Sequence, residues 1–158
     1  MTQKPDTTTN RFMILIADRN PHVRKFLSRE LAAEGYRVLT AKDGREVLRI
    51  LDAGEPPDLL VFDLEIPDVS GLQILKKLQD RDPPLPVVVH TFLNEYANHP
   101  AVKKSAAFIE KTGENIDGLK VVIRGVLHKC YAERKSQDKI SKADSPEFDS
   151  KNGYPLSS

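Results

Sequence analysis

The chain has 158 residues, which is enough for one domain with a buried core and short extensions. Its 24 Lys and Arg residues almost balance 23 Asp and Glu residues, and the net charge of +1 excludes a general attraction to nucleic acid or anionic lipid. The single cysteine, Cys130, excludes an internal disulfide framework, and without a signal peptide or long apolar span we expect a cytoplasmic protein with no membrane contact.

Residues 1–10 are polar and carry no signal for the start of a helix or strand, so we expect a flexible N-terminal arm. From residue 11 onward, short β-type runs alternate with amphipathic helical runs. This alternation is typical of βαβ units and predicts an α/β domain with a parallel sheet covered by helices on both faces. We expect five strand–helix pairs within residues 11–135.

The first two pairs have clear boundaries. The pattern predicts a strand over 12–17 and a helix over about 21–34, with Asn20 as its N-cap. The second strand is expected at 36–41. Asp43 begins the next helix, whose apolar residues repeat with helical spacing.

The third strand is predicted to lie in the middle of the sheet. Residues 58–63 are apolar between two acids, as in a strand buried on both faces, and a helix follows over about 70–80. The fourth strand is expected at 87–91. Residues 94–104 are polar and contain Pro100, which cannot donate a backbone hydrogen bond, so we expect a short or frayed fourth helix.

The fifth strand is expected at 107–110 and the last helix over 115 to about 134, with one apolar stripe facing the core. After Lys135 the sequence turns to Ser, Lys, Asp, Gly and Pro with only isolated apolar residues. Such a segment cannot bury enough surface to offset its ordering entropy. We therefore expect residues 136–158 to form a disordered tail, too short to be a DNA-binding domain.

Three charged residues stand at the ends of strand-like segments: Asp18, Asp63 and Lys111. Because the carboxyl ends of parallel strands share one edge of a sheet, we expect these side chains to meet in one crevice. Two carboxylates facing one lysine suit a divalent cation and a phosphoryl group. The four histidines lack metal-ligand spacing, and no Gly-rich phosphate loop follows the first strand.

Further segments agree in order and spacing with one known family. They are residues 41–48, the run from Asp63 to Gly71, Thr91, and the Phe-Ile-Glu-Lys run at 108–111. With Asp18, they make residues 11–134 resemble the receiver domain of bacterial two-component response regulators, of the single-domain chemotaxis-regulator type. The resemblance implies a doubly wound, flavodoxin-like sheet of strand order 2-1-3-4-5.

The resemblance also implies a phosphoryl-transfer mechanism. A histidine kinase, a phosphotransfer protein or a small phosphodonor would supply a phosphoryl group to the carboxylate of Asp63. In the family a magnesium ion neutralises much of the charge, and its ligands here would be Asp18, Asp63 and the main-chain carbonyl of Glu65.

A switch and an output are implied in the same way. Lys111 would pair with one phosphoryl oxygen, and the Thr91 hydroxyl would donate to another. Inward movement of Thr91 would allow Phe108 to change rotamer, which alters the surface offered to an unidentified downstream protein. The chain would catalyse only its own phosphorylation and dephosphorylation, so we do not expect an enzyme acting on other substrates.

One departure from the family pattern concerns the metal, because Asp18 is followed by Arg19 where the family usually has a second acid. Replacing a carboxylate by a guanidinium about 5 Å from a divalent ion costs several kcal/mol even at an effective dielectric of roughly 20, so magnesium affinity should be weak. Two arrangements stay open. Arg19 turns to solvent or pairs with Glu65, leaving a loosely bound ion; or it takes the cation's place and locks Asp63 in a phosphorylation-independent pseudo-receiver adaptor.

A third alternative is an aspartate-nucleophile phosphatase of the haloacid dehalogenase type, because Asp63-Leu64-Glu65 follows a strand. Those enzymes have a second aspartate two residues after the nucleophile and a cap region, and this chain matches neither well. A milder departure from the receiver pattern is Thr112, which stands where proline is usual and removes a rigid constraint from the loop after Lys111.

Overall fold

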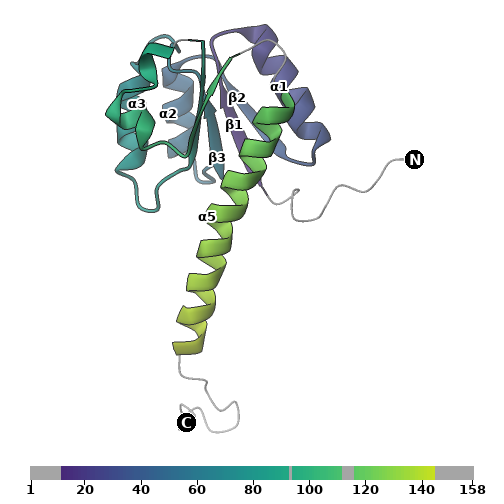
Figure 1. Cartoon of the computed structure of the whole chain (residues 1–158), viewed down its shortest axis with the longest axis vertical. Helices are drawn as coiled ribbons and strands as arrows, with labels where there is room; N and C mark the ends of the chain where they lie inside the picture. The colour runs from purple at the N-terminus through teal and green to yellow at the C-terminus, as the bar shows by residue number, and fades with distance from the viewer. Residues whose placement is uncertain (1–11, 93, 112–115, 145–158) are drawn as a thin grey trace, which may run out of the picture. The chain divides into compact units, whose positions relative to one another are not determined.

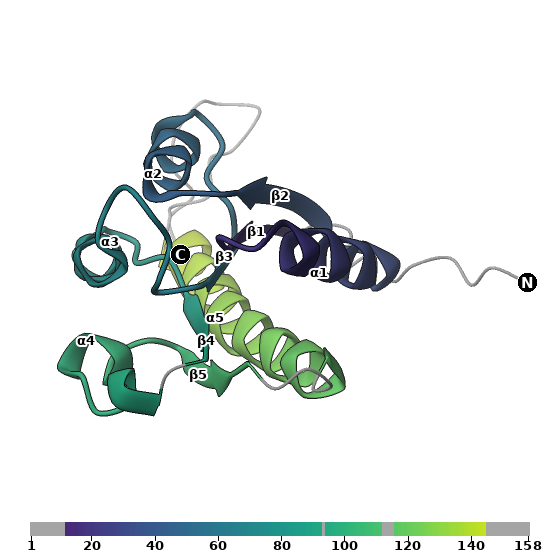
Figure 2. The ribbon, with the colours of Figure 1, turned by 90° about the horizontal axis from the view of Figure 1, so that it is seen from above.

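The computed structural model describes residues 12–92, 94–111 and 116–144. Its sheet has five parallel strands in the order β2-β1-β3-β4-β5, as the family resemblance implies; Figure 1 labels β1, β2 and β3, and Figure 2 labels all five strands. The strands are β1 (Met13–Ala17), β2 (Arg37–Ala41), β3 (Leu59–Phe62), β4 (Val87–Thr91) and β5 (Ala107–Glu110).

Helices cover both faces of this sheet, as the alternating pattern predicts. The helices are α1 (Pro21–Ala33), α2 (Gly44–Asp52), α3 (Gly71–Gln79), the 3-10 turn η2 (Asn94–Tyr96), α4 (Pro100–Lys103) and α5 (Ile116–Asp144). Figure 2 shows α1 on one side of the strands and α2, α3 and α4 on the other. The doubly wound α/β fold is therefore confirmed.

The register aligns the carboxyl ends of the strands. Ala17 at the end of β1 pairs with Ala41 of β2 on one side and with Phe62 of β3 on the other. All four residues of β3 are buried, which confirms its predicted place inside the sheet. Each fully buried Leu, Val or Phe stabilises the fold by about 1.5–3 kcal/mol, so β3 contributes strongly to the stability of the sheet.

The fourth helix is short, as expected, but Pro100 acts differently from the prediction. Pro100 is the first residue of α4 rather than an interruption of it. At that position the missing N–H would have had no partner within the helix. The Nδ1 atom of His99 accepts a hydrogen bond from the Ala101 amide at 3.1 Å and so caps the helix.

The predicted end of the last helix is wrong, because α5 continues to Asp144 and residues 136–144 are helical instead of disordered. The physical reason is local: residues 135–144 contain no Gly or Pro, and Lys, Gln and Ala favour a helix even where burial is small. The predicted arm at 1–10 and the rest of the predicted tail, 145–158, lie outside the described residues. In the described part of the chain, no helix combines the length and hydropathy needed to cross a membrane.

Candidate functional site

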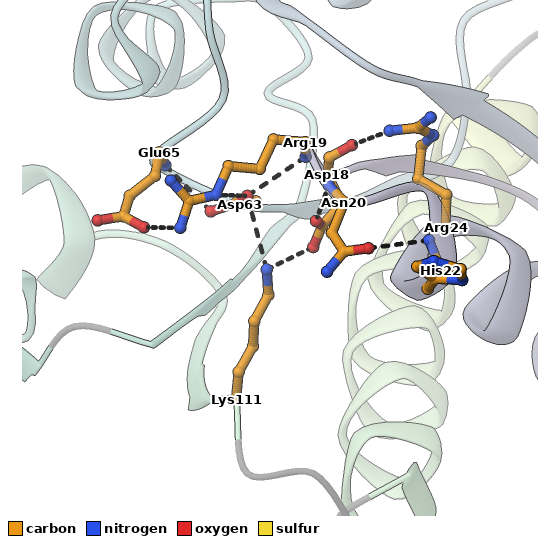
Figure 3. Close-up of polar contacts among 8 residues, drawn as sticks. All are labelled: Asp18, Arg19, Asn20, His22, Arg24, Asp63, Glu65 and Lys111. Carbon is orange, nitrogen blue, oxygen red and sulfur yellow. Dashed lines mark hydrogen bonds and ion pairs between the residues drawn. The ribbon is translucent and has the colours of Figure 1, made fainter.

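The three charged residues at the strand ends lie close together, as predicted. The Lys111 Nζ lies 2.5 Å from Asp18 Oδ2 and 3.5 Å from Asp63 Oδ2 (Figure 3). The side chains of Lys111, Asp18 and Asp63 are only 5%, 3% and 1% exposed. Charges this deeply buried are stable only when they are paired, so each of these groups depends on the others.

Backbone hydrogen bonds fix the positions of all three residues. The amide of Asp63 donates to the last carbonyl of β1 at 2.9 Å, and the amide of Asp18 donates to the last carbonyl of β2 at 3.1 Å. The amide of Lys111 donates to the last carbonyl of β4 at 2.8 Å. The hydrogen-bond pattern of the parallel sheet thus extends by one residue to each of these positions, and the sheet fixes the Cα positions of the three residues.

Asp18 is held through both its carboxylate and its main chain. Its Oδ1 accepts a hydrogen bond from the amide of Asn20 at 2.8 Å, and its main-chain carbonyl accepts one from Arg24 Nη1 at 2.7 Å. Burial raises the pKa of Asp18 above its usual value, and the hydrogen bond from Lys111 opposes this rise. The hydrogen bonds from Lys111 and from the Asn20 amide therefore favour the charged form of Asp18 against the effect of burial.

The loop after β3 holds the other carboxylate in place. The Oδ1 atom of Asp63 accepts a hydrogen bond from the Glu65 amide at 3.0 Å. Gly71, at the start of α3, lies against the main chain of Leu64 so closely that a Cβ there would stand 2.3 Å from the Leu64 carbonyl oxygen. The start of α3 and the residues that orient Asp63 are therefore packed backbone against backbone.

Replacing Gly71 by alanine is expected to lower the free energy of unfolding by about 1–3 kcal/mol, because the backbone of Leu64 has to move to admit the methyl group. Chemical denaturation followed by circular dichroism measures the loss. Gly54→Ala is the matched control, since a Cβ at Gly54 meets no atom within 4 Å, and it is expected to change stability by less than about 1 kcal/mol. Equal effects of the two substitutions would contradict this packing argument.

Arg19 contacts two acids at once. Its Nη2 lies 2.6 Å from Glu65 Oε2, its Nε lies 3.9 Å from Asp63 Oδ2, and its main-chain amide donates to Asp63 Oδ2 at 3.4 Å (Figure 3). Of the two arrangements left open by the sequence, the structure contains the pair with Glu65, yet the guanidinium also stays beside Asp63. The Arg19 side chain is 48% exposed, so its outer side faces solvent.

Thr91 and Phe108 lie where the resemblance implies, at the end of β4 and within β5. Thr91 is fully buried, and its Oγ1 has no hydrogen-bond partner among the described residues. Leaving a buried hydroxyl unpaired costs about 1–3 kcal/mol, so the unpaired group calls for an explanation such as a bound water, an ion or a catalytic role. Phe108 is partly buried and packs against the core. Thr112 lies outside the described residues.

Sequence reasoning missed one aromatic residue of the site. The Phe92 ring lies 5.1 Å from Lys111 Nζ, in a cation–π contact, and Phe92 is 53% exposed. Its position in the sequence, directly after Thr91, could have indicated this contact, because it places Phe92 at the same edge of the sheet as the charged residues. Phe92 thus forms an exposed apolar border beside the buried lysine.

The residues present do not fit a tightly held magnesium ion. Mg²⁺ requires nearly octahedral oxygen ligands, yet both oxygens of Asp18 already face donors, and Asp63 Oδ2 lies beside two cationic side chains. Arg19 places a positive charge where a third carboxylate would help. Among the described residues, no cluster of three His, Cys, Asp or Glu side chains has an arrangement that could hold a metal.

Comparison with curated proteins agrees with the resemblance. The family model of the response regulator receiver domain matches residues 14–124. The chain is 30% identical over 132 residues to the DNA-binding transcriptional regulator NtrC of Salmonella typhimurium strain LT2, covering 82% of this chain and 28% of that protein. It is 37% identical over 78 residues to the transcriptional regulatory protein GlrR of Escherichia coli K12, covering 49% of this chain and 17% of that protein. The chain therefore spans less than a third of the length of these relatives.

Solved structures agree as well. The response regulator protein TrrA of Thermotoga maritima, solved in complex with Mg(2+)-BeF, has a TM-score of 0.67 and 27% identity, covering 73% of this chain and 98% of that one. A structure of the histidine kinase ThkA in complex with TrrA matches with a TM-score of 0.66 and 28% identity, at the same coverage. Magnesium binding and aspartate phosphorylation are typical of this family. The chain belongs to the response regulator receiver domain family of two-component signal transduction.

Proposed function

We propose that this receiver domain accepts a phosphoryl group on Asp63 and signals through contacts with other proteins. The observation that carries the proposal is the buried Asp63 carboxylate at the sheet edge, with the Lys111 ammonium 3.5 Å from its Oδ2. The buried hydroxyl of Thr91 supports the same assignment, since it is a donor without an acceptor among the residues that the structure describes. Together these groups supply a nucleophile, a positive charge and a hydrogen-bond donor.

In the proposed reaction, the Asp63 carboxylate attacks the phosphorus of the donor, and the bond from phosphorus to the leaving oxygen breaks. Oδ1 accepts the shorter amide hydrogen bond, 3.0 Å from Glu65 against 3.4 Å from Arg19 to Oδ2, and Oδ2 is the oxygen beside Lys111, so we assign the phosphoryl group to Oδ2. Lys111 then neutralises one phosphoryl oxygen and Thr91 donates to another. Phosphoryl transfer needs positioning and charge neutralisation more than proton transfer, and these fixed groups supply both.

The proposed phosphodonor is a histidine kinase or a phosphotransfer protein. Support comes from TrrA, a structural relative that was solved bound to the histidine kinase ThkA. The proposed output is a contact with a downstream protein, made through the surface around Phe108. On this proposal the chain acts on no substrate other than its own aspartate. We further propose that it binds magnesium only weakly, because Arg19 lies beside Asp63.

Intact-mass measurement after incubation with acetyl phosphate tests the proposal. We expect a single phosphoryl adduct in the wild-type chain and none in Asp63→Asn, which keeps the shape of the side chain but loses the nucleophile. Circular dichroism of both proteins controls for folding. Complete absence of an adduct would favour the pseudo-receiver adaptor, in which Arg19 neutralises Asp63 permanently. Steady release of phosphate from added phosphoesters would favour the phosphatase.

A further inference from the structure

Arg19 stands at the mouth of the acceptor site, where the family usually has a metal-binding acid. We propose that its guanidinium supplies the positive charge that stabilises a phosphoryl group on Asp63, so that phosphorylation of this chain does not require a divalent cation. This inference rests on the proposed function, and it names the group that neutralises the transferred phosphate.

The first step of the argument is geometric. Asp63 Oδ2 has two cationic neighbours at similar range, Lys111 Nζ at 3.5 Å and Arg19 Nε at 3.9 Å. The Arg19 amide also points at the same oxygen, at 3.4 Å. A phosphoryl group bonded to this oxygen therefore enters a region of positive potential that the chain provides by itself.

The second step concerns what keeps Arg19 from blocking the nucleophile. A permanent lock would require a direct hydrogen bond between the guanidinium and Asp63, but the distance of 3.9 Å is too long for one. Glu65 binds the far end of the guanidinium at 2.6 Å and so holds it to one side. Arg19 is thus close enough to act through charge, while its guanidinium makes no direct hydrogen bond that would occupy Oδ2.

The third step is an exchange of partners. Phosphorylation converts the single negative charge of Asp63 into a dianionic group with three further oxygens. A guanidinium has five donors in a planar fork that suits phosphate, and only one of its nitrogens is used by Glu65. The Glu65 side chain is partly exposed, so water can solvate its carboxylate when Arg19 turns toward the phosphoryl oxygens.

The reaction is balanced without a metal. With acetyl phosphate as donor, a bond forms between Asp63 Oδ2 and phosphorus while the bond between phosphorus and the acetate oxygen breaks. Acetate leaves with the electron pair, and no proton is consumed. The cations present before and after the step are those of Arg19 and Lys111, which the fold holds in place.

The test measures the rate of adduct formation from acetyl phosphate by intact mass, in EDTA and in magnesium. For the wild-type chain we expect the two rates to agree within about threefold. Arg19→Met should lower the rate in EDTA by about 100- to 1,000-fold, the usual effect of losing one charge-stabilising donor. Arg19→Lys should retain part of the rate, because it keeps the charge but loses the fork. Arg49→Met, which removes an exposed arginine of α2, is the matched control and should match the wild type.

Arg19→Asp gives a second, independent readout. This variant restores the pair of acids that is usual in the family, so it should form no adduct in EDTA and should regain the reaction in magnesium. Titration calorimetry should show that it binds magnesium at least about tenfold more tightly than the wild type, because an attractive charge replaces a repulsive one.

The outcomes separate this inference from the proposed function. If the wild-type chain forms an adduct only in magnesium, and Arg19→Met reacts at the wild-type rate, the inference is wrong while Asp63 remains the acceptor. If none of the variants forms an adduct in either condition although circular dichroism shows that all are folded, the proposed function itself fails. Tight magnesium binding by the wild-type chain would also overturn the inference.

Discussion

Replacing Lys111 by methionine is expected to lower the free energy of unfolding by about 3–5 kcal/mol at neutral pH, the largest loss we predict for a single residue of the site. Lys111 Nζ is the shared partner of two buried carboxylates, Asp18 at 2.5 Å and Asp63 at 3.5 Å. Methionine fills a similar volume but leaves both carboxylates without their common cation. Urea denaturation with an unchanged m-value measures the loss as stability rather than as a change in compactness.

The deficit of this variant should depend on pH. Burial already raises the pKa of Asp18, and without the opposing hydrogen bond from Lys111 that pKa should rise further. Asp18 then takes up a proton as the pH falls, so the loss of stability caused by Lys111→Met should shrink toward acid pH.

Lys120→Met is the matched control: Lys120 lies 2.9 Å from Glu30 and 3.2 Å from Glu34, but these acids are partly exposed. Its loss should cost about 1 kcal/mol or less. Equal losses for the two lysines would contradict the burial argument.

His90 is expected to make the fold sensitive to acid. Burial lowers the pKa of His90 from 6.5 to about 4, with a further lowering from Lys111 and an opposing effect from Asp63. Its Nδ1 has no hydrogen-bond partner among the described residues. The folded chain therefore binds this proton more weakly than the unfolded chain. The contribution of neutral His90 to the free energy of unfolding is fully present above pH 6.5. It is lost as the pH falls toward 4, and the loss amounts to roughly 3 kcal/mol.

Denaturation at a series of pH values between 7 and 4 tests this expectation. His90→Gln should remove the acid-dependent loss, while His22→Gln, on the exposed side of α1, should keep the wild-type slope. Asp18 acts in the opposite direction, because a carboxyl group with a raised pKa favours the folded state as it takes up its proton. This effect is common to all three proteins and cancels in the comparison. A wild-type slope in His90→Gln would show that another group carries the acid sensitivity.

The fold was predictable because hydrophobic pattern and topology reinforce each other. The apolar run at 58–63 indicates a buried central strand, and a parallel sheet then places Asp18, Asp63 and Lys111 at a common edge whatever the details of the loops. The pairing of Arg19 with both Glu65 and Asp63 could not be chosen in advance, since it depends on the rotamer of one long side chain and on a loop conformation.

Two other differences have simple causes. Pro100 is a helix breaker in the interior of a helix but a favourable first residue, and the sequence alone does not say where the helix begins. The extension of α5 to Asp144 follows from local helix propensity, whereas the prediction of disorder rested on the lack of burial. Phe92 was overlooked because an exposed aromatic residue gives no periodic signal.

Main-chain hydrogen bonds tie Asp18, Asp63 and Lys111 to the last carbonyls of neighbouring strands. The positions of these three residues therefore depend on the sheet rather than on the surface segments that a partner protein would contact. The sheet anchors the backbone of these three residues, so the connection between β4 and α4 can be exchanged without moving the main chain of Asp63, whereas the loop after β3 cannot, because its Glu65 amide holds the Asp63 carboxylate. A chimaera that receives the β4–α4 connection of another receiver is consequently expected to change its choice of partner and to keep the phosphorylation that we propose at Asp63.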